Sequence, residues 1–329
     1  LFFQKKQKER GSFFCRTDFI HTNMFIIKYR AFFFWITGLI LAGAIGALVF
    51  LGLPLSIDFT GGSLVEVAYE ESRPNIVELK EAVVAGGFAD AHLRESGDTG
   101  VSVRTHSLTA DEHTALLSIL SNSGALTELR FNSIGPSLGS ELAIKAMYAL
   151  AMVTLAIVLY IAWAFRKVSK PVPSWGYGII VVLMLAIDVI VPAGFFAILA
   201  HFTGAQADAL FVVALLALLG YCVNDVIVIF DRVREHLKLN EEAYKANPKM
   251  MEEPFEVTIG KSIDETMGRS VNTSLTVALA LLAVILFGPE ATRNFALVMM
   301  VGVIIGTFSS ICRSAPLLIP LANALKKKQ

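Results

Sequence analysis

The run FVVALLALLGYCVNDVIVIF, residues 211–230, is long and apolar except for one acidic residue. A helix that crosses a bilayer needs about 20 predominantly apolar residues, so this run predicts a transmembrane helix. Asp225 lies inside it, and a carboxylate at that depth costs about 2.5–3.5 kcal/mol on insertion scales. Helix packing alone does not require that cost. The run therefore indicates a functional intramembrane acid, with a hydrogen bond to a neighbouring helix as the structural alternative.

The composition agrees with a membrane protein and excludes several other classes. The chain has 329 residues, of which 55% are hydrophobic and 17% are charged, whereas soluble domains carry about 25% charge. Cys15, Cys222 and Cys312 form no CxxC pair, so we expect apolar fillers rather than a disulfide or a zinc site. No phosphate-binding glycine loop or metal-ligand spacing occurs. The sequence thus predicts no enzyme, no cofactor, no metal and no nucleic-acid partner.

Apolar runs of spanning length occur at six places, which predicts a membrane α-helical fold. The expected transmembrane helices cover residues 31–53, 142–165, 176–200, 209–230, 267–288 and 295–323. Residues 142–323 thus hold the second to sixth helices.

The distribution of Lys and Arg predicts the orientation. The leader 1–30, the loops after the second and fourth spans and the tail 324–329 are basic. In the short connectors near 201–208 and 288–294, Arg293 is the single residue that is either Lys or Arg. Cytoplasmic loops carry the excess of positive charge, so both termini are expected in the cytoplasm and residues 54–141 outside it.

Residues 54–141 read as a small α+β domain. SLVEVAYE (63–70) alternates like a strand, Ser72 and Pro74 open a helix that glycines close near residue 86, and a turn at 97–100 predicts a hairpin. Thr109 and Glu112 form a capping box for a second helix, and residues 126–134 form a last strand. The order β-α-β-β-α-β predicts a ferredoxin-like domain.

Arg269 is the expected partner of Asp225. It lies in the first turn of the fifth span, so the two residues can share a level on helices consecutive in sequence. Protonating the acid would release the arginine and deprotonation would recapture it, which is a two-state element suited to proton-coupled transport. A static ion pair that holds the bundle is the alternative.

Four further features of the spans remain open between a functional and a structural role. Asp188, in the third span, is a relay partner of Asp225 or bonds a neighbouring helix. Asn224 is expected to orient Asp225, and Tyr221 lies one turn before it. Arg313, in the sixth span, has two possible roles. It competes with Arg269 for Asp225, or its side chain extends toward the cytoplasmic headgroups, and we favour the second role. The same span has small residues every fourth position, which predicts a packing seam: Gly302, Gly306, Ser310 and Ser314.

Five segments, in order, resemble signatures of the SecD/SecF family of bacterial protein-export membrane proteins. They are SIDFTGG (56–62), GPSLGSEL (135–142), GYCVNDVIVIFDRVRE (220–235), TMGRSVNTSLT (266–276) and VGVIIGTFSSI (301–311). The resemblance covers nearly the whole chain, and the single small outer domain favours the smaller, SecF branch. Asp58, Gly61 and Gly62 belong to the first signature and are expected to form a turn that ties the first helix to the outer domain.

The resemblance implies a multi-pass protein of the bacterial cytoplasmic membrane, in the resistance-nodulation-division (RND) superfamily. Such a protein uses the proton-motive force to assist late-stage export by the Sec pathway. It implies Asp225 as the proton-carrying acid and Arg269 as its partner. The implied partners are a SecD subunit, the SecYEG translocon, YajC, YidC and the translocating polypeptide.

The chain departs from the family pattern at three places: Ile187 replaces a histidine, Arg313 replaces an apolar residue, and the segment 231–261 is longer. A proton-driven exporter of lipids or small molecules is the alternative function, although such exporters usually carry twelve spans.

Overall fold

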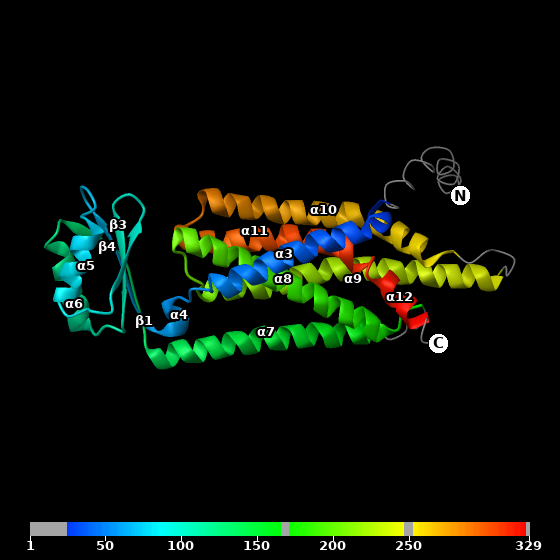
Figure 1. The fold of residues 1–329 in the computed structure, drawn as a ribbon, viewed down its shortest axis with the longest axis horizontal. Coiled ribbons are helices and arrows are strands. Elements are labelled where there is room, and N and C mark those ends of the chain that lie inside the picture. Colours follow the sequence, from blue (N-terminus) through cyan, green and yellow to red (C-terminus); the bar gives the residue numbers. More distant parts are fainter. Residues whose placement is uncertain (1–24, 166–170, 247–252, 327–329) are drawn as a thin grey trace, which may run out of the picture. The chain divides into compact units, whose positions relative to one another are not determined.

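The computed structural model describes residues 25–165, 171–246 and 253–326 (Figure 1). Cys15, most of the basic leader, three charges of the second loop and the last three residues therefore lie outside the described residues. Two compact units are present: a helical unit of Leu1–Phe50, Met152–Phe195 and Ala214–Gln329, and a second unit of Leu51–Ala151 and Phe196–Val213.

Six stretches of described helix are long and apolar enough to cross a membrane, as predicted. They are α3 (Arg30–Phe50), α7 (Pro136–Ala164), α8 (Ser174–Thr203), α9 (Ala209–Ala246), α10 (Phe255–Phe287) and the stretch Thr292–Leu325. The last stretch is not one regular helix, because α11 (Glu290–Ser309) is followed by a π-helical turn, η1 (Ser310–Ser314), and by α12 (Leu318–Lys326).

The segment 231–261, expected as a loop, consists largely of helix. The helix α9 continues to Ala246, and α10 begins directly after Pro254. Residues 231–246 contain neither Gly nor Pro, and Lys245 lies 2.6 Å from Glu241 as an i,i+4 pair, which favours helix on a polar surface. Hydropathy alone marked where the apolar part of each helix ends, not where the helix itself ends.

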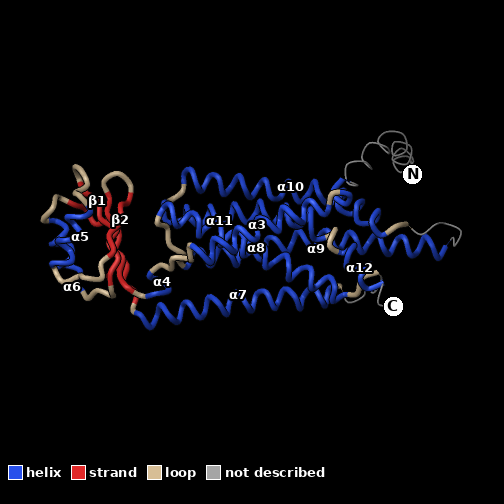
Figure 2. Tube along the Cα trace, in the orientation of Figure 1, coloured by secondary structure: helices blue, strands red, loops and turns tan. Residues whose placement is uncertain are grey.

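The outer domain has the predicted ferredoxin-like order, which confirms the fold class. Its strands are β1 (Gly62–Tyr69), β2 (His92–Ser96), β3 (Gly100–Thr105) and β4 (Leu126–Ile134), in an antiparallel sheet of order β2-β3-β1-β4. Figure 2 shows α5 (Ile76–Ala85) and α6 (Ala110–Ser121) on one side of these strands. Alternate strand residues and one stripe of each helix form the core: Val65, Val67, Val101, Val103, Leu79, Val83, Leu116 and Leu120.

Capping residues determine where the two outer helices begin. The capping box of Thr109 and Glu112 is present, as predicted. The helix α5 begins later than expected, because the side chain of Asn75 accepts a hydrogen bond from the Val77 N–H at 3.0 Å and takes the N-cap position.

Small residues let the helices of the helical unit approach one another closely. A Cβ atom added to Gly194 would lie 2.6 Å from the Cα of Ala44, so α8 passes against α3 at this point. A Cβ on Gly302 would clash with Leu218, and one on Gly306 with Cys222. The two glycines of the predicted stripe therefore form a packing seam between α11 and α9 within the chain.

Candidate functional site

Asp225 lies on α9 and is buried, with 5% of its surface exposed. Ser270 on α10 is a polar neighbour of its side chain and is 1% exposed. Among the described residues, neither Asp225 Oδ2 nor Ser270 Oγ has a hydrogen-bond partner. An unpartnered carboxylate oxygen away from water is costly in free energy. Binding a proton or a nearby cation would therefore stabilise this acid.

Arg269 is the cation that acts electrostatically on Asp225. The described residues contain no ion pair shorter than 4.0 Å between them, and Arg269 lies on the exposed side of α10. Arg269 and Asp225 are therefore close in the fold but not locked together in this state.

A cluster of hydroxyl groups lies next to the acid and joins three helices. The Tyr221 hydroxyl donates to Ser274 Oγ at 2.9 Å, and Ser274 Oγ lies 2.5 Å from Thr307 Oγ1. Ser274 is one helical turn from Ser270, so the cluster begins about 6 Å along the helices from Asp225. Sequence reasoning identified Tyr221 but not its partners, because they come from α10 and α11.

Asn224 does not orient Asp225 within this chain. It lies on the exposed side of α9, and no hydrogen bond joins it to Asp225 in the described ranges. Consecutive helix residues point about 100° apart, which is why the neighbour in sequence is not the neighbour in space. Several polar residues of α10 are also exposed: Arg269, Asn272, Thr273 and Thr276.

Arg313 is buried inside the helical unit, and the acid that acts on it is not Asp225. It lies in η1 and is 3% exposed, and the acid that acts on it is Asp188 of α8, which is 1% exposed. The two intramembrane acids thus face different arginines.

The junction residues lie in the second unit, where the chain enters β1. Ser56 caps a four-residue helix, α4 (Ile57–Thr60), and Asp58 Oδ2 accepts a hydrogen bond from the Ala209 N–H, the first residue of α9, at 2.9 Å. Gly61 and Gly62 follow with φ of +71° and +120°, conformations that favour glycine. Both glycines thus have the positive φ that the expected turn would use, whereas the short helix before them was not foreseen.

The first turn of α7 packs directly on this glycine turn. A Cβ on Gly61 would lie 2.7 Å from Pro136 Cα, and a Cβ on Gly139 would lie 2.5 Å from Gly61 N. Arg104 of β3 donates to Leu55 O at 2.9 Å and to Thr60 Oγ1 at 2.5 Å. Two segments far apart in the sequence, SIDFTGG (56–62) and GPSLG (135–139), therefore pack against each other.

Comparison with known proteins identifies the family. Residues 116–324 match the family "Protein export membrane protein SecD/SecF, C-terminal", and residues 46–72 match the "SecD/SecF GG Motif". The protein translocase subunit SecF of Thermobaculum terrenum is 36% identical over 91% of this chain and 94% of its own length.

The chain belongs to the SecD/SecF family. A second SecF subunit, from Anaerolinea thermophila, is 37% identical over 89% of this chain and 92% of its own. The crystal structure of SecDF from Thermus thermophilus is similar with a TM-score of 0.76 and 29% identity over 90% of this chain, and a super-membrane-facing form of SecDF with a TM-score of 0.63. This chain spans 38% and 39% of those longer SecDF chains.

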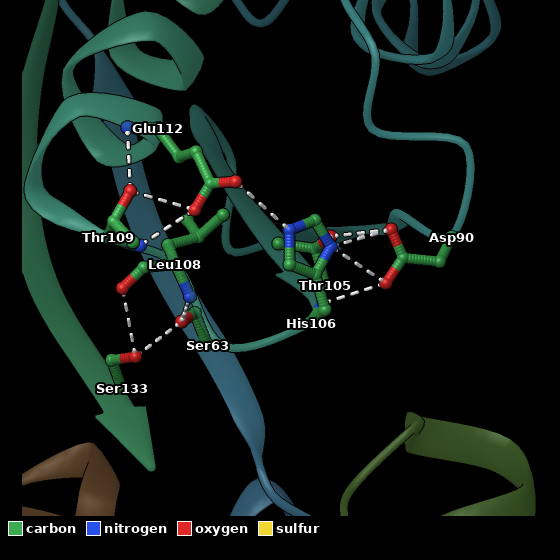
Figure 3. A network of polar contacts seen from close by, with 8 residues as sticks. All are labelled: Ser63, Asp90, Thr105, His106, Leu108, Thr109, Glu112 and Ser133. Carbon is green, nitrogen blue, oxygen red and sulfur yellow. Dashed lines mark hydrogen bonds and ion pairs between the residues drawn. The ribbon is translucent and has the colours of Figure 1, made fainter. Parts of the chain in front are cut away.

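The outer domain of this SecD/SecF family member holds a polar network around His106 (Figure 3). His106 Nδ1 lies 3.1 Å from Asp90 Oδ1, its backbone N–H donates to Asp90 Oδ2 at 2.7 Å, and its Nε2 lies 3.7 Å from Glu112 Oε1. The hydrogen bond with Asp90 raises the pKa of His106. Partial burial acts to raise the pKa of Asp90, but its hydrogen bonds with His106 and Thr105 prevail and lower that pKa to about 2.

The His106–Asp90 pair should make the stability of the outer domain depend on pH. The unfolded pKa values are about 6.5 and 3.9. The histidine contribution is present below about pH 6.5 and lost as pH rises through its raised pKa, and the aspartate contribution is present above about pH 3.9 and lost as pH falls toward 2. Because both groups are about half exposed, screening limits the effect to about 0.5–1 kcal/mol.

Hydrogen–deuterium exchange of the full-length protein tests this expectation. At each pH, amide exchange of β1 and β3 is compared between wild type and His106→Gln. The variant should exchange several-fold faster at pH 5.5 and nearly like wild type at pH 8.5. His92→Gln, at an exposed position on β2, is the matched control. A difference that is equal at both pH values would contradict the expectation.

Proposed function

We propose that this chain is a SecF-type subunit that uses the proton-motive force to assist late-stage export of unfolded proteins by the Sec translocase. The observation that carries the proposal is the buried carboxylate of Asp225, which has an unpartnered oxygen and faces Ser270, with Arg269 acting on it electrostatically. A group in this position can exist in two charge states that favour different helix arrangements. Asp225 is then the proton carrier and Arg269 the group that responds to its charge.

A partner subunit completes the site in this proposal. Asn224 and Arg269 lie on exposed surfaces of α9 and α10, and polar groups facing lipid are costly. A partner that covers this surface removes that cost. The relatives named SecF and the longer SecDF chains of known structure support a SecD subunit as this partner. As further contacts we propose SecYEG, YajC and YidC, with a translocating polypeptide as cargo. Both chain ends lie in the cytoplasm.

The proposal is tested with membrane vesicles that contain this chain, its SecD partner and the translocon. The late stage of export of a precursor protein is measured with the proton gradient intact and after a protonophore collapses it. We expect vesicles with the complex to export faster only while the gradient is present. Equal stimulation without a gradient would overturn the proposal. Proton uptake that follows added lipids or small molecules instead would favour an exporter.

Arg269→Met and Arg313→Met separate the two arginines. Arg269→Met leaves Asp225 without the cation that acts on it, so proton-dependent stimulation should fall at least tenfold while the complex still assembles. Arg313→Met should lower the amount of folded protein but leave the stimulation per folded complex within about twofold. Vesicle export normalised to purified complex measures both. If Arg313→Met abolishes the stimulation and Arg269→Met does not, the assignment of the arginines is wrong.

A further inference from the structure

The short segment between α8 and α9, residues 204–208, belongs to the same compact unit as the outer domain. We call this segment the α8–α9 connector. Gly204 follows the last residue of α8 and has a φ of +72°, a conformation that ends helices. Asp208 precedes α9 and accepts a hydrogen bond from the Phe211 N–H at 2.9 Å, as an N-cap does. The connector is therefore fixed to both helix ends and follows their positions.

The middle of the connector pairs with the segment that leads into the outer domain. The Ala207 N–H donates to Pro54 O at 2.8 Å, and the Ser56 N–H donates to Ala207 O at 2.8 Å. Leu55 and Ala207 are thus partners in a parallel β-bridge. Two segments that enter the outer domain and α9 therefore run side by side and share backbone hydrogen bonds.

Two arginines of the outer sheet bind these two paired segments. Arg94 of β2 donates to Gly204 O at 2.5 Å. Arg104 of β3 donates to Leu55 O at 2.9 Å. The two arginines share a face of the sheet, because Arg104 lies opposite His92 in the antiparallel register, two residues before Arg94 on β2. One face of the outer sheet thus holds one carbonyl oxygen of each paired segment.

The charges that hold the connector match the dipoles of the helices that it joins. Arg94 is a cation and binds at the C-terminal end of α8, where cations are stabilised. Asp58 is an anion and accepts the Ala209 N–H at the N-terminal end of α9, where anions are stabilised. The close approach at the first contact requires glycine, because a Cβ on Gly204 would collide with the Arg94 guanidinium. Both ends of the connector are therefore held by charged side chains from outside it.

The helix α9 joins this arrangement to the proposed proton carrier. It continues without interruption from Ala209 to Ala246, and so passes from the unit of the outer domain into the helical unit. Asp225 lies about 24 Å along α9 from Ala209, at 1.5 Å per residue. A continuous helix of this kind passes a displacement to its end, where a loosely held loop would absorb it.

We propose that Arg94 and Asp58 clamp the α8–α9 connector to the outer domain, so that a displacement of α9 moves the outer domain with it. Arg94 is a positioning residue in this proposal, since it acts on the connector and not on the proton. The clamp stays closed while α9 moves. Its role in export rests on the proposed function of Asp225, whereas its effect on the connector does not.

Hydrogen–deuterium exchange of the purified full-length protein tests the clamp independently of export. Arg94→Met removes the donor to Gly204 O but keeps a long side chain. The amides of residues 205–209 should exchange several-fold faster in this variant than in wild type. Arg73→Met is the matched control, because Arg73 donates to Gly97 O at 2.9 Å within the outer domain, and it should leave those amides unchanged. Equal exchange in Arg94→Met and wild type would overturn the proposal.

Membrane vesicles that contain the complex test whether the clamp couples proton movement to export. In Arg94→Met, proton uptake should stay within about twofold of wild type while gradient-dependent export falls about tenfold. Arg94→Lys keeps a charged donor and should recover part of the export. A fall of uptake and export in equal proportion, per folded complex, would show that Arg94 is merely structural and overturn the coupling. Wild-type vesicles without gradient-dependent export would overturn the proposed function instead, and the exchange experiment then decides the clamp alone.

A disulfide across the β-bridge distinguishes a clamp that stays closed from a contact that opens in each cycle. Adjacent strands lie roughly 4.8 Å apart, and disulfides join Cα atoms roughly 4.4–6.8 Å apart. Leu55→Cys combined with Ala207→Cys should therefore form a crosslink on oxidation. We expect export by the oxidised protein to stay within about twofold of the same protein after reduction. The two single-cysteine variants are the controls. A loss of export that appears on oxidation of the double variant alone, and that reduction restores, would show that the contact must open.

Discussion

Asp225→Asn is expected to reduce proton-dependent export to the level of wild-type vesicles with a collapsed gradient. Asparagine has nearly the same shape as aspartate but cannot take up or release a proton. Burying the neutral amide avoids the cost of about 2.5–3.5 kcal/mol for a carboxylate at membrane depth, so the variant should fold and insert at least as well as wild type. The unpartnered oxygen beside Ser270 is the atom whose protonation the substitution removes.

The measurement is the export rate of a precursor in vesicles, with and without a gradient, at equal amounts of folded complex. Asp231→Asn is the matched control, because it makes the same chemical change on the same helix but at an exposed position. It should leave the rate within about twofold of wild type. If Asp225→Asn exports at the wild-type rate under a full gradient, Asp225 is not the proton carrier.

Gly61→Val should abolish complementation of an export-deficient strain while the protein still inserts into the membrane. Gly61 has a φ of +71° and a ψ of 172°, a region that is essentially restricted to glycine and costs a side-chain-bearing residue about 1–3 kcal/mol. The added Cβ would also lie 2.7 Å from Pro136 Cα and 3.0 Å from Pro136 N. Those are backbone atoms at the start of α7, so a rotamer change cannot relieve the clash, and displacement adds roughly 1–3 kcal/mol or more.

Gly52→Val separates the clash from the backbone strain. Gly52 has nearly the same φ, +72°, but nothing lies within 4 Å of the position a Cβ would occupy. We therefore expect Gly52→Val to complement partly and Gly61→Val not at all. Protease protection of the outer domain reports on insertion in both variants. Normal complementation by Gly61→Val would show that the contact between the glycine turn and α7 is not needed for export.

The amino-acid sequence by itself determined the number of spans, the ferredoxin-like order of the outer domain and Asp225 as the acid of interest. These features depend on apolar run length, strand alternation and local capping, which are properties of neighbouring residues. The same local signals did not predict the helix ends correctly where the apolar run stops before the helix does. For this reason α9 and α10 extend into the polar segment 231–261 that was expected as a loop.

Only the tertiary structure decided which residues meet. Depth along a helix placed Arg269 and Arg313 equally well near Asp225, because periodicity gives the level and face of a side chain but not the helix opposite it. The π-helical turn buries Arg313 toward Asp188, and the 100° step of a helix turns Asn224 away from Asp225. Likewise, the contact of Gly61 with Pro136 and Gly139 joins segments far apart in sequence. Such contacts depend on the packing of whole helices, and no local pattern in the sequence records that packing.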